Sequence, residues 1–320
     1  MSETLAPLDL QSVRIVRAIA ETGTITGAAQ TLGYSQPAVS QHLQRAESRL
    51  GIPLVTRIGR TVRLTEAGQV LARHALTITS ALDAAAGELA DLAGLRSGTV
   101  RIASFPTASS TIVPKLLSSM AMAHPGISIV YVEAQPPEAV ALLRDGGADL
   151  AITFSYPGDR ADPHKESVNG LTMETLFEEE TVIVLPADHP QADRDEVDLA
   201  AFEREKWIAG CPRCRGHLLA VCDTAGFEPQ ISFETDNASA VLSMVASGLG
   251  VAMLPRLALS TALVPPNVAI RAHQPRSTRS LHVLSNEGAM RIPSLAVTRA
   301  ALFELEGSVW GLAPRVGRRG

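Results

Sequence analysis

Hydrophobic residues at helical spacing, followed by an alternation of strands and helices, divide the chain into an N-terminal helical part and a longer α/β part. Apolar residues three and four positions apart predict helices over 8–22, 25–32 and 35–50. A glycine follows each of these runs and ends the helix. Two short β-prone stretches in PLVTRIGRTVRLT, on either side of Gly59, predict a hairpin.

From residue 99 onward, short apolar strands alternate with amphipathic helices. The expected strands cover 99–103, 127–133, 149–154, 176–186, 207–210, 231–234, 251–255, 268–271 and 280–284. The expected helices cover 107–123, 136–145, 216–225, 237–247 and 294–306. This order predicts two α/β lobes, with the turn-rich segment 155–170 as a crossover.

The second and third N-terminal helices are separated by a tight turn, which is typical of a helix-turn-helix that places one helix in the major groove of DNA. An apolar stripe that includes Val39 and Leu43 faces the first two helices, so the opposite face of the third helix is polar. Glutamines can pair with base edges, and arginines in the hairpin can approach phosphates. The candidate DNA-contacting residues are Thr24, Thr26, Ser35, Gln36, Pro37, Ala38, Ser40, Gln41, Gln44, Arg45, Arg57, Arg60 and Arg63. The alternative is a solvated polar helix face.

A long helix without proline is expected between Thr65 and Leu95, ahead of a hinge at 95–98. Its apolar residues alternate spacings of four and three, as the seam of a coiled coil does. The seam consists of Leu71, Ala75, Ile78, Leu82, Ala85, Leu89 and Leu92. It indicates pairing of two subunits, and the alternative is a helix packed on the core of its own chain.

Three motifs give the chain a specific resemblance. ETGTITGAAQTL, SQPAVSQHLQRAESRLG and RIGRTVRLTEAG, within residues 8–70, resemble the LysR-type transcriptional regulators. The resemblance implies a winged helix-turn-helix, an antiparallel pair of linker helices, and a two-lobed regulatory domain like the periplasmic binding proteins. It also implies double-stranded DNA, a small effector for which an anion is one candidate, a homodimer or homotetramer, and RNA polymerase as partners. We expect an effector that closes the lobes to change the spacing of the DNA-binding pairs and the bending of the DNA, a change that in that family commonly turns a repressor-like form into an activator.

The expected domain organisation follows from these elements. It is a DNA-binding domain at 1–65, a linker helix at 66–96, a first regulatory lobe at 97–160 and 265–306, a second lobe at 161–264, and a basic tail at 307–320.

An effector site is expected where strands end and helices begin, because free N–H groups there favour anions. Ser104 and Thr107 occupy such a position and match, by position, effector-contacting residues of the family. The full set of candidates is Ser104, Thr107, Ser109, Thr153, Phe154, Ser155, Trp207, Gly210, Asp236 and Asn237. The alternative role for the hydroxyl and Asx residues is helix capping.

Three cysteines form an unusual cluster with a histidine: Cys211, Cys214, His217 and Cys222. A CxxC motif at a helix N-terminus beside Arg213 and Arg215 favours a thiolate and a redox sensor at Cys211 and Cys214. Metal sensing is a second interpretation, although the spacing fits no standard zinc pattern. In the third, the thiols are reduced and idle while the arginines bind an anion. No cofactor or resident metal is expected.

Composition and charge limit the remaining classes. The net charge is −5, but residues 1–63 hold seven arginines, no lysine and four acidic residues, which gives +3 where DNA is expected. No apolar run is long enough to span a membrane, and no signal peptide is recognisable, so a cytoplasmic protein is expected. Because catalytic motifs are missing and the eight histidines are scattered, an enzyme is not expected. The N-terminal module argues against a solute-binding protein.

Overall fold

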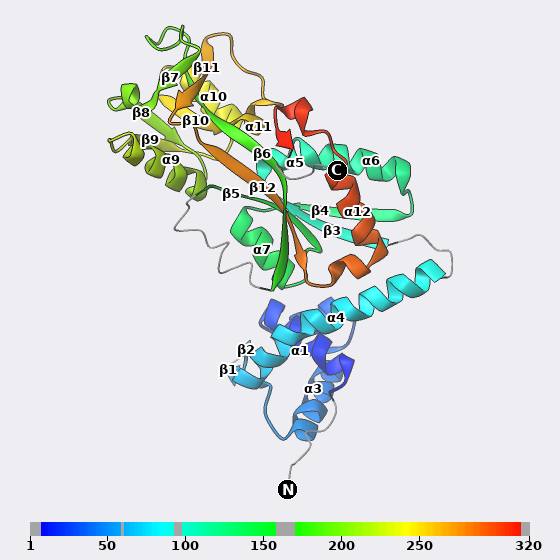
Figure 1. Ribbon diagram of the computed structural model, residues 1–320. Coiled ribbons are helices and arrows are strands. Elements are labelled where there is room, and N and C mark those ends of the chain that lie inside the picture. Colours follow the sequence, from blue (N-terminus) through cyan, green and yellow to red (C-terminus); the bar gives the residue numbers. More distant parts are fainter. Residues whose placement is uncertain (1–7, 59–60, 93–97, 158–169, 315–320) are drawn as a thin grey trace. The chain divides into compact units, whose positions relative to one another are not determined.

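The computed structural model describes residues 8–58, 61–92, 98–157 and 170–314 (Figure 1). The chain divides into two compact units, residues 1–86 and 87–320. None of the helices in the described ranges is long and apolar enough to cross a membrane.

The N-terminal unit is built on three capped helices. They are α1 (Leu10–Thr22), α2 (Ile25–Leu32) and α3 (Gln36–Leu50). The side chains of Asp9, Thr24 and Ser35 each accept a hydrogen bond from a backbone N–H in the first turn of the helix that follows. The sequence therefore predicted all three helices to within two residues, because local caps and glycines define their ends.

A two-stranded hairpin and a long helix complete this unit. The hairpin consists of β1 (Val55–Ile58) and β2 (Thr61–Leu64), and it leads into α4 (Glu66–Leu92). Glu47 of α3 holds the hairpin, because its carboxylate accepts the backbone N–H groups of Leu54 and Val55 at 2.8 and 3.2 Å. Gly68 lets α4 approach the chain closely, since a Cβ there would lie 2.1 Å from the carbonyl oxygen of Leu54.

The first lobe of the C-terminal unit contains a mixed sheet in the order β4-β3-β5-β12-β6. Its elements are β3 (Gly98–Ser104), α5 (Pro106–Ser109), α6 (Ile112–Ala123), β4 (Ile127–Glu133), α7 (Pro136–Arg144), β5 (Leu150–Ser155), β12 (Thr278–Asn286), η2 (Ala289–Arg291) and α12 (Pro293–Phe303). α6 and α12 cover one face of this sheet, and α7 covers the other (Figure 1). Separate hydrophobic cores fill the two faces.

The second lobe continues the same sheet through β10, β8 and β9. Its elements are β7 (Glu196–Asp198), η1 (Leu199–Phe202), β8 (Lys206–Ala209), α9 (Pro212–Thr224), β9 (Gln230–Glu234), α10 (Ala238–Ala246), β10 (Val251–Pro255), α11 (Arg256–Leu259) and β11 (Val268–Gln274). The long strand β6 (Leu171–Pro186) joins the lobes, since it pairs with β12 up to Glu180 and with β10 from Thr181. The predicted two-lobed α/β architecture is confirmed.

Two expectations about the C-terminal unit were wrong in detail, and a third concerns residues that are largely outside the described ranges. The helix expected over 107–123 is interrupted and forms α5 and α6. The lobe boundaries at 161 and 265 are displaced, because the first half of β6 belongs to the first lobe and β11 pairs with β6 and β7 in the second. Residues 158–169 of the expected crossover lie outside the described residues.

The expected basic tail is also structured as far as residue 314. It contains η3 (Gly307–Trp310) and β13 (Ala313–Pro314), and β13 pairs with β6. Trp310 and Leu312 are buried in the core of the first lobe, with 9% and 3% of their surface exposed. The segment's three arginines, Arg315, Arg318 and Arg319, all lie outside the described residues.

Candidate functional site

The third helix of the N-terminal unit presents the expected polar surface. Val39, Leu43 and Ala46 are buried against the unit's core. The solvent-exposed predicted residues of α3 are Gln36, Pro37, Ala38, Gln41, Gln44 and Arg45, and Ser40 is half-buried. A helix that is buried on one side and polar on the other can enter a major groove without unfolding its own core.

Some predicted DNA-contacting residues already have partners in the free protein. Thr24 and Ser35 cap α2 and α3 through their hydroxyl oxygens. Gln36 donates its amide N–H to the Ser40 hydroxyl at 2.9 Å. Thr26, Gln41 and Arg45 are exposed, and Gln41 can offer its amide group to a base edge.

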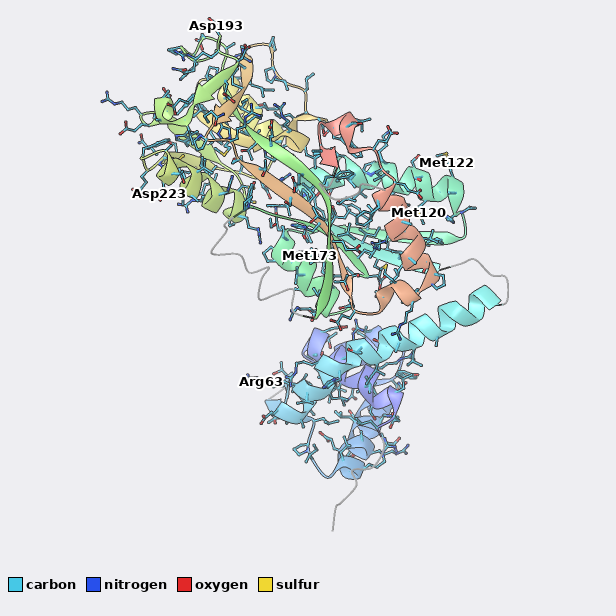
Figure 2. The ribbon with its side chains drawn as sticks, viewed as in Figure 1. Arg63, Met120, Met122, Met173, Asp193 and Asp223 are labelled. Atoms are coloured by element: carbon cyan, nitrogen blue, oxygen red, sulfur yellow. The ribbon has the colours of Figure 1, made fainter. Side chains whose placement is uncertain are left out.

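The hairpin carries one described arginine at its surface. Arg63 of β2 is exposed and projects from the hairpin in Figure 2. The Arg57 side chain and all of Arg60 lie outside the described residues. Arg63 therefore offers an exposed positive charge on the hairpin, the type of side chain that contacts phosphates in protein–DNA complexes.

An acidic residue anchors α3 to α1 beside this surface. Asp9 forms an ion pair with Arg49, and its carboxylate lies 3.1 Å from the ring nitrogen of His42. Partial burial opposes ionisation of Asp9, but hydrogen bonds from the Ser12 backbone, Arg49 and His42 outweigh it and hold the carboxyl pKa well below its usual range. The carboxylate is therefore charged at neutral pH and fixes the start of α1.

The heptad seam of α4 divides into two parts. Leu71 and Ala75 are buried in the core of the N-terminal unit, and Ile78 packs against that core. Leu82 is 41% exposed and Ala85 is exposed. For the start of the seam, the alternative of a helix packed on its own chain is therefore correct, because these side chains belong to the core that α1 also contributes to. The side chains of Leu89 and Leu92 lie outside the described residues.

A pocket of about 50 Å³ is lined by residues from both lobes of the C-terminal unit. Thr107 and Phe154 contribute from the first lobe, and Gly210 and Asp236 from the second. The first turn or N-cap of each of α7, α9 and α10 borders the pocket, through Gln135, Cys211 and Ala238 respectively. Because helix N-termini carry partial positive charge, their convergence favours an anionic ligand.

A buried arginine lies in the wall of this pocket. Arg279 of β12 stands directly opposite Glu179 of β6, and its Nε donates to the carboxylate at 2.6 Å. Both residues are 2% exposed, and Glu179 also accepts the backbone N–H of Leu257 at 2.7 Å. Burial works against the charge of Arg279, but Glu179 outweighs it and raises the arginine pKa, so the guanidinium keeps its charge.

The same guanidinium reaches the effector candidates. Its Nη2 donates to the hydroxyl of Thr107 at 3.1 Å. Its central carbon lies 4.5 Å from the centre of the Phe154 ring and 5.1 Å from that of Phe105. This arrangement fixes a positive charge and a hydroxyl group side by side, between aromatic surfaces, at the edge of the pocket.

The predicted effector residues fall into distinct groups. Thr107, Phe154, Gly210 and Asp236 line the pocket. Ser104 and Thr153 are fully buried, and neither hydroxyl has a hydrogen-bond partner among the described residues.

The remaining effector candidates have structural roles instead. Trp207 is fully buried in the core of the second lobe, and its indole N–H donates to the Phe202 carbonyl. Ser109 donates to the Phe105 carbonyl, Ser155 bonds to His282, and Asn237 caps α10. None of these four borders the pocket.

Sequence reasoning missed the buried charge in the pocket wall, Arg279, and its partner Glu179. Arg279 and Leu281 occupy the same face of β12, so an arginine stands where alternation expects an apolar residue. Glu179 occupies the equivalent inward position in β6. Each of these two apolar strands has one charged residue facing inward, and this was the signal available in the sequence. It could not show that the two strands pair with each other.

The cysteine cluster is only partly assembled. Cys211 and Cys214 line the pocket, whereas Cys222 is buried in the core of the second lobe. All three are free cysteines. Across the described ranges, no three His, Cys, Asp or Glu side chains are grouped so that they could hold a metal ion, so the structure gives the metal interpretation no support.

A helix-turn-helix unit followed by a two-lobed unit with a pocket defines a class of ligand-responsive DNA-binding proteins. The family model for the lysR family of bacterial regulatory helix-turn-helix proteins matches residues 10–69, and that for the LysR substrate binding domain matches residues 93–305. The chain belongs to the LysR family of transcriptional regulators, with a DNA-binding domain and an effector-binding domain.

Individual relatives agree with this assignment. The probable HTH-type transcriptional regulator LrrA of Synechococcus elongatus is 28% identical over 289 residues, which cover 90% of this chain and 94% of that protein. A probable hydrogen peroxide-inducible genes activator of Mycobacterium avium is 31% identical over 258 residues, covering 78% of each chain. Full-length OxyR from Pseudomonas aeruginosa, solved as a point variant, shares the fold with a TM-score of 0.70 at 21% identity, covering 93% of this chain and 95% of that one.

Proposed function

We propose that this regulator binds a small carboxylate-containing effector in the pocket beside Arg279 and that the effector controls DNA binding by α3. The observation that carries the proposal is the buried Arg279 guanidinium, held by Glu179 and hydrogen-bonded to Thr107 at the pocket wall. Three helix N-termini add positive potential around it. A ligand can shift the regulator only if it binds one arrangement of the lobes better than another.

The pocket volume indicates how such a ligand acts. About 50 Å³ accommodates only a few atoms, whereas sites for drug-sized ligands commonly span about 300–1,000 Å³. An effector of ordinary metabolite size therefore requires the lobes to separate, and β6 and the start of β12 are the strands that cross between them. The separation of the two lobes would therefore depend on the size of the bound ligand.

A thermal-shift screen of small carboxylates and amino acids tests the effector proposal. We expect at least one compound to raise the melting temperature, since a ligand at about 100 times its Kd adds about 2.7 kcal/mol. Thr107→Val keeps the side-chain shape and removes the hydroxyl, so it should reduce the shift. A screen without any shift, or a shift that Thr107→Val leaves undiminished, contradicts the proposal.

The outer part of α4 is the proposed subunit contact. Leu82 is exposed although it continues the apolar seam, and a second copy of α4 would cover it. Two recognition helices held about one DNA turn apart, or a multiple of it, would then read a two-part site. Sedimentation of Leu82→Glu should show a smaller assembly than the wild type. Val70→Glu, at an equally exposed position of α4 outside the seam, is the matched control and should leave the assembly unchanged.

A further inference from the structure

Cys211 and Cys214 are placed to form a bond with each other. Cys211 caps the N-terminus of α9, and Cys214 lies in its first turn. Their sulfur atoms are 2.9 Å apart, and the backbone N–H of Cys214 points to the Cys211 sulfur at 3.4 Å. Gly210 permits this close approach, because a Cβ at residue 210 would lie 3.0 Å from that of Cys214.

The surroundings favour a thiolate on Cys214. The Cys211 thiol donates a hydrogen bond to it, the Tyr156 hydroxyl lies 3.6 Å from its sulfur, and the charge of Arg279 is nearby. The Cys211 hydrogen bond is the largest cause, and together with Arg279 it outweighs burial and lowers the Cys214 pKa to about 6. The pKa of Cys211 is raised, so this thiol keeps its proton and remains the donor.

Cys222 offers a comparison on the same helix. It is fully buried in the core of the second lobe, and burial alone raises its pKa to about 12. It therefore lacks both the exposure and the ionised sulfur that an oxidant requires. The contrast separates a reactive pair at the helix start from a structural cysteine two turns later.

We propose that Cys211 and Cys214 are a redox site, which a small hydroperoxide oxidises to a disulfide inside the pocket. The pocket of about 50 Å³ between the lobes borders both cysteines and accommodates an oxidant of a few atoms. This site goes beyond effector binding, and its oxidation does not require the effector.

The reaction proceeds in two balanced steps. The Cys214 thiolate attacks one oxygen of the hydroperoxide, the O–O bond breaks, and the other oxygen leaves as water or an alcohol after taking up a proton. The sulfenic acid formed on Cys214 is then attacked by the Cys211 sulfur. The S–S bond forms, the S–O bond breaks, and the hydroxyl leaves as water with the Cys211 proton.

Oxidation also changes the charge of the pocket wall. The reduced site holds the Cys214 thiolate and Glu179 around Arg279, and the disulfide removes one of these two negative charges. If the proposed effector is an anion, the oxidised form should bind it more tightly. This consequence rests on the proposed function, whereas disulfide formation does not.

Thiol mapping of the full-length protein tests the redox site. The reduced protein is treated with hydrogen peroxide, denatured, alkylated in the unfolded state, and analysed by intact and peptide mass spectrometry. We expect a loss of two hydrogen atoms per chain, a crosslink between Cys211 and Cys214, and full alkylation of Cys222, with reversal by dithiothreitol. The oxidation rate should fall roughly tenfold from pH 7 to pH 5, because the thiolate fraction falls by that factor.

Three variants define the outcome. Cys214→Ser should abolish the reaction, and Cys222→Ala should leave it unchanged. Cys211→Ser retains an N-cap oxygen and should leave a Cys214 sulfenic acid that dimedone traps. The proposal is overturned if all three thiols remain alkylatable after peroxide, or if the crosslink joins Cys222 or two chains.

Discussion

The polar face of α3, proposed to meet DNA, and the charged pair beside the pocket, proposed to meet a small ligand, differ in exposure. Gln41 and Arg45 of α3 are open to solvent, whereas Arg279 and Glu179 are buried. A surface that meets DNA needs no charge partner of its own, because the phosphates supply one. A charge that meets a small ligand must be fixed before the ligand arrives, and the fold neutralises it with a second buried charge.

The largest expected effect comes from breaking the buried pair. Arg279→Leu leaves Glu179 uncompensated in the interior and should destabilise the C-terminal unit by about 3–5 kcal/mol. Urea unfolding followed by tryptophan fluorescence reports on this unit alone, because Trp207 and Trp310 are the chain's two tryptophans.

A second variant separates loss of the pair from loss of packing. In the Arg279→Leu/Glu179→Gln double variant, glutamine still accepts the Leu257 N–H and carries no charge, so much of the stability should return. If the single variant unfolds like the wild type, the buried charge is not essential to this fold.

The recognition face should show the next largest effect, on binding and not on folding. Gln41→Ala removes an exposed amide and should weaken specific DNA binding by about 1–3 kcal/mol, or roughly 5- to 150-fold. Fluorescence anisotropy with the protein's own upstream DNA measures the change. Gln69→Ala, an exposed glutamine on α4, is the matched control and should bind as the wild type does. Equal binding by both variants would exclude Gln41 from base reading.

The Asp9 cap tests a polar group that is neither fully buried nor fully exposed. Asp9→Ala should cost the N-terminal unit about 1 kcal/mol at pH 7, since α1 loses its cap. Because the folded pKa of Asp9 is depressed, its contribution is complete above the unfolded pKa of about 4 and is lost as the pH falls below it. Thermal unfolding by circular dichroism should show the two proteins converging at low pH. A difference that persists unchanged at low pH would mean that the charge of Asp9 contributes nothing.

The smallest effect is expected at an exposed pair in the second lobe. Arg215 and Glu234 lie 2.9 Å apart, with 43% and 56% of their side chains exposed. Arg215→Ala should change the free energy of unfolding by less than about 1 kcal/mol, because water and salt screen the pair. Tryptophan-monitored urea unfolding checks this value against that of Arg279→Leu. Similar losses of stability for the two variants would contradict the claim that the buried Arg279–Glu179 pair matters more to folding than the exposed pair.

The sequence predicted the N-terminal unit closely because its signals are local. Asp9, Thr24 and Ser35 cap the next helix within three residues, and one glycine ends each run. The order of strands and helices in the C-terminal unit was also predictable from their periods.

The pocket was less predictable because its groups are distant in sequence. Arg279 bonds to Thr107 across 172 positions and to Glu179 across 100. A strand pattern shows which side chains face inward, but not which strands pair, so β6 could not be recognised as a strand shared by both lobes. β8 illustrates the same limit, since Gly210 directly after the strand borders the pocket while Trp207 near its start is buried in the core of the second lobe.

The most direct test of the central claim compares DNA binding to the protein's own upstream region with binding to a scrambled duplex, over a range of salt concentrations. We expect the specific site to bind roughly 1,000-fold or more tightly at physiological salt, with both affinities falling as salt rises. Equal affinity for the two duplexes at every salt concentration would contradict the assignment of α3 as a reader of DNA sequence.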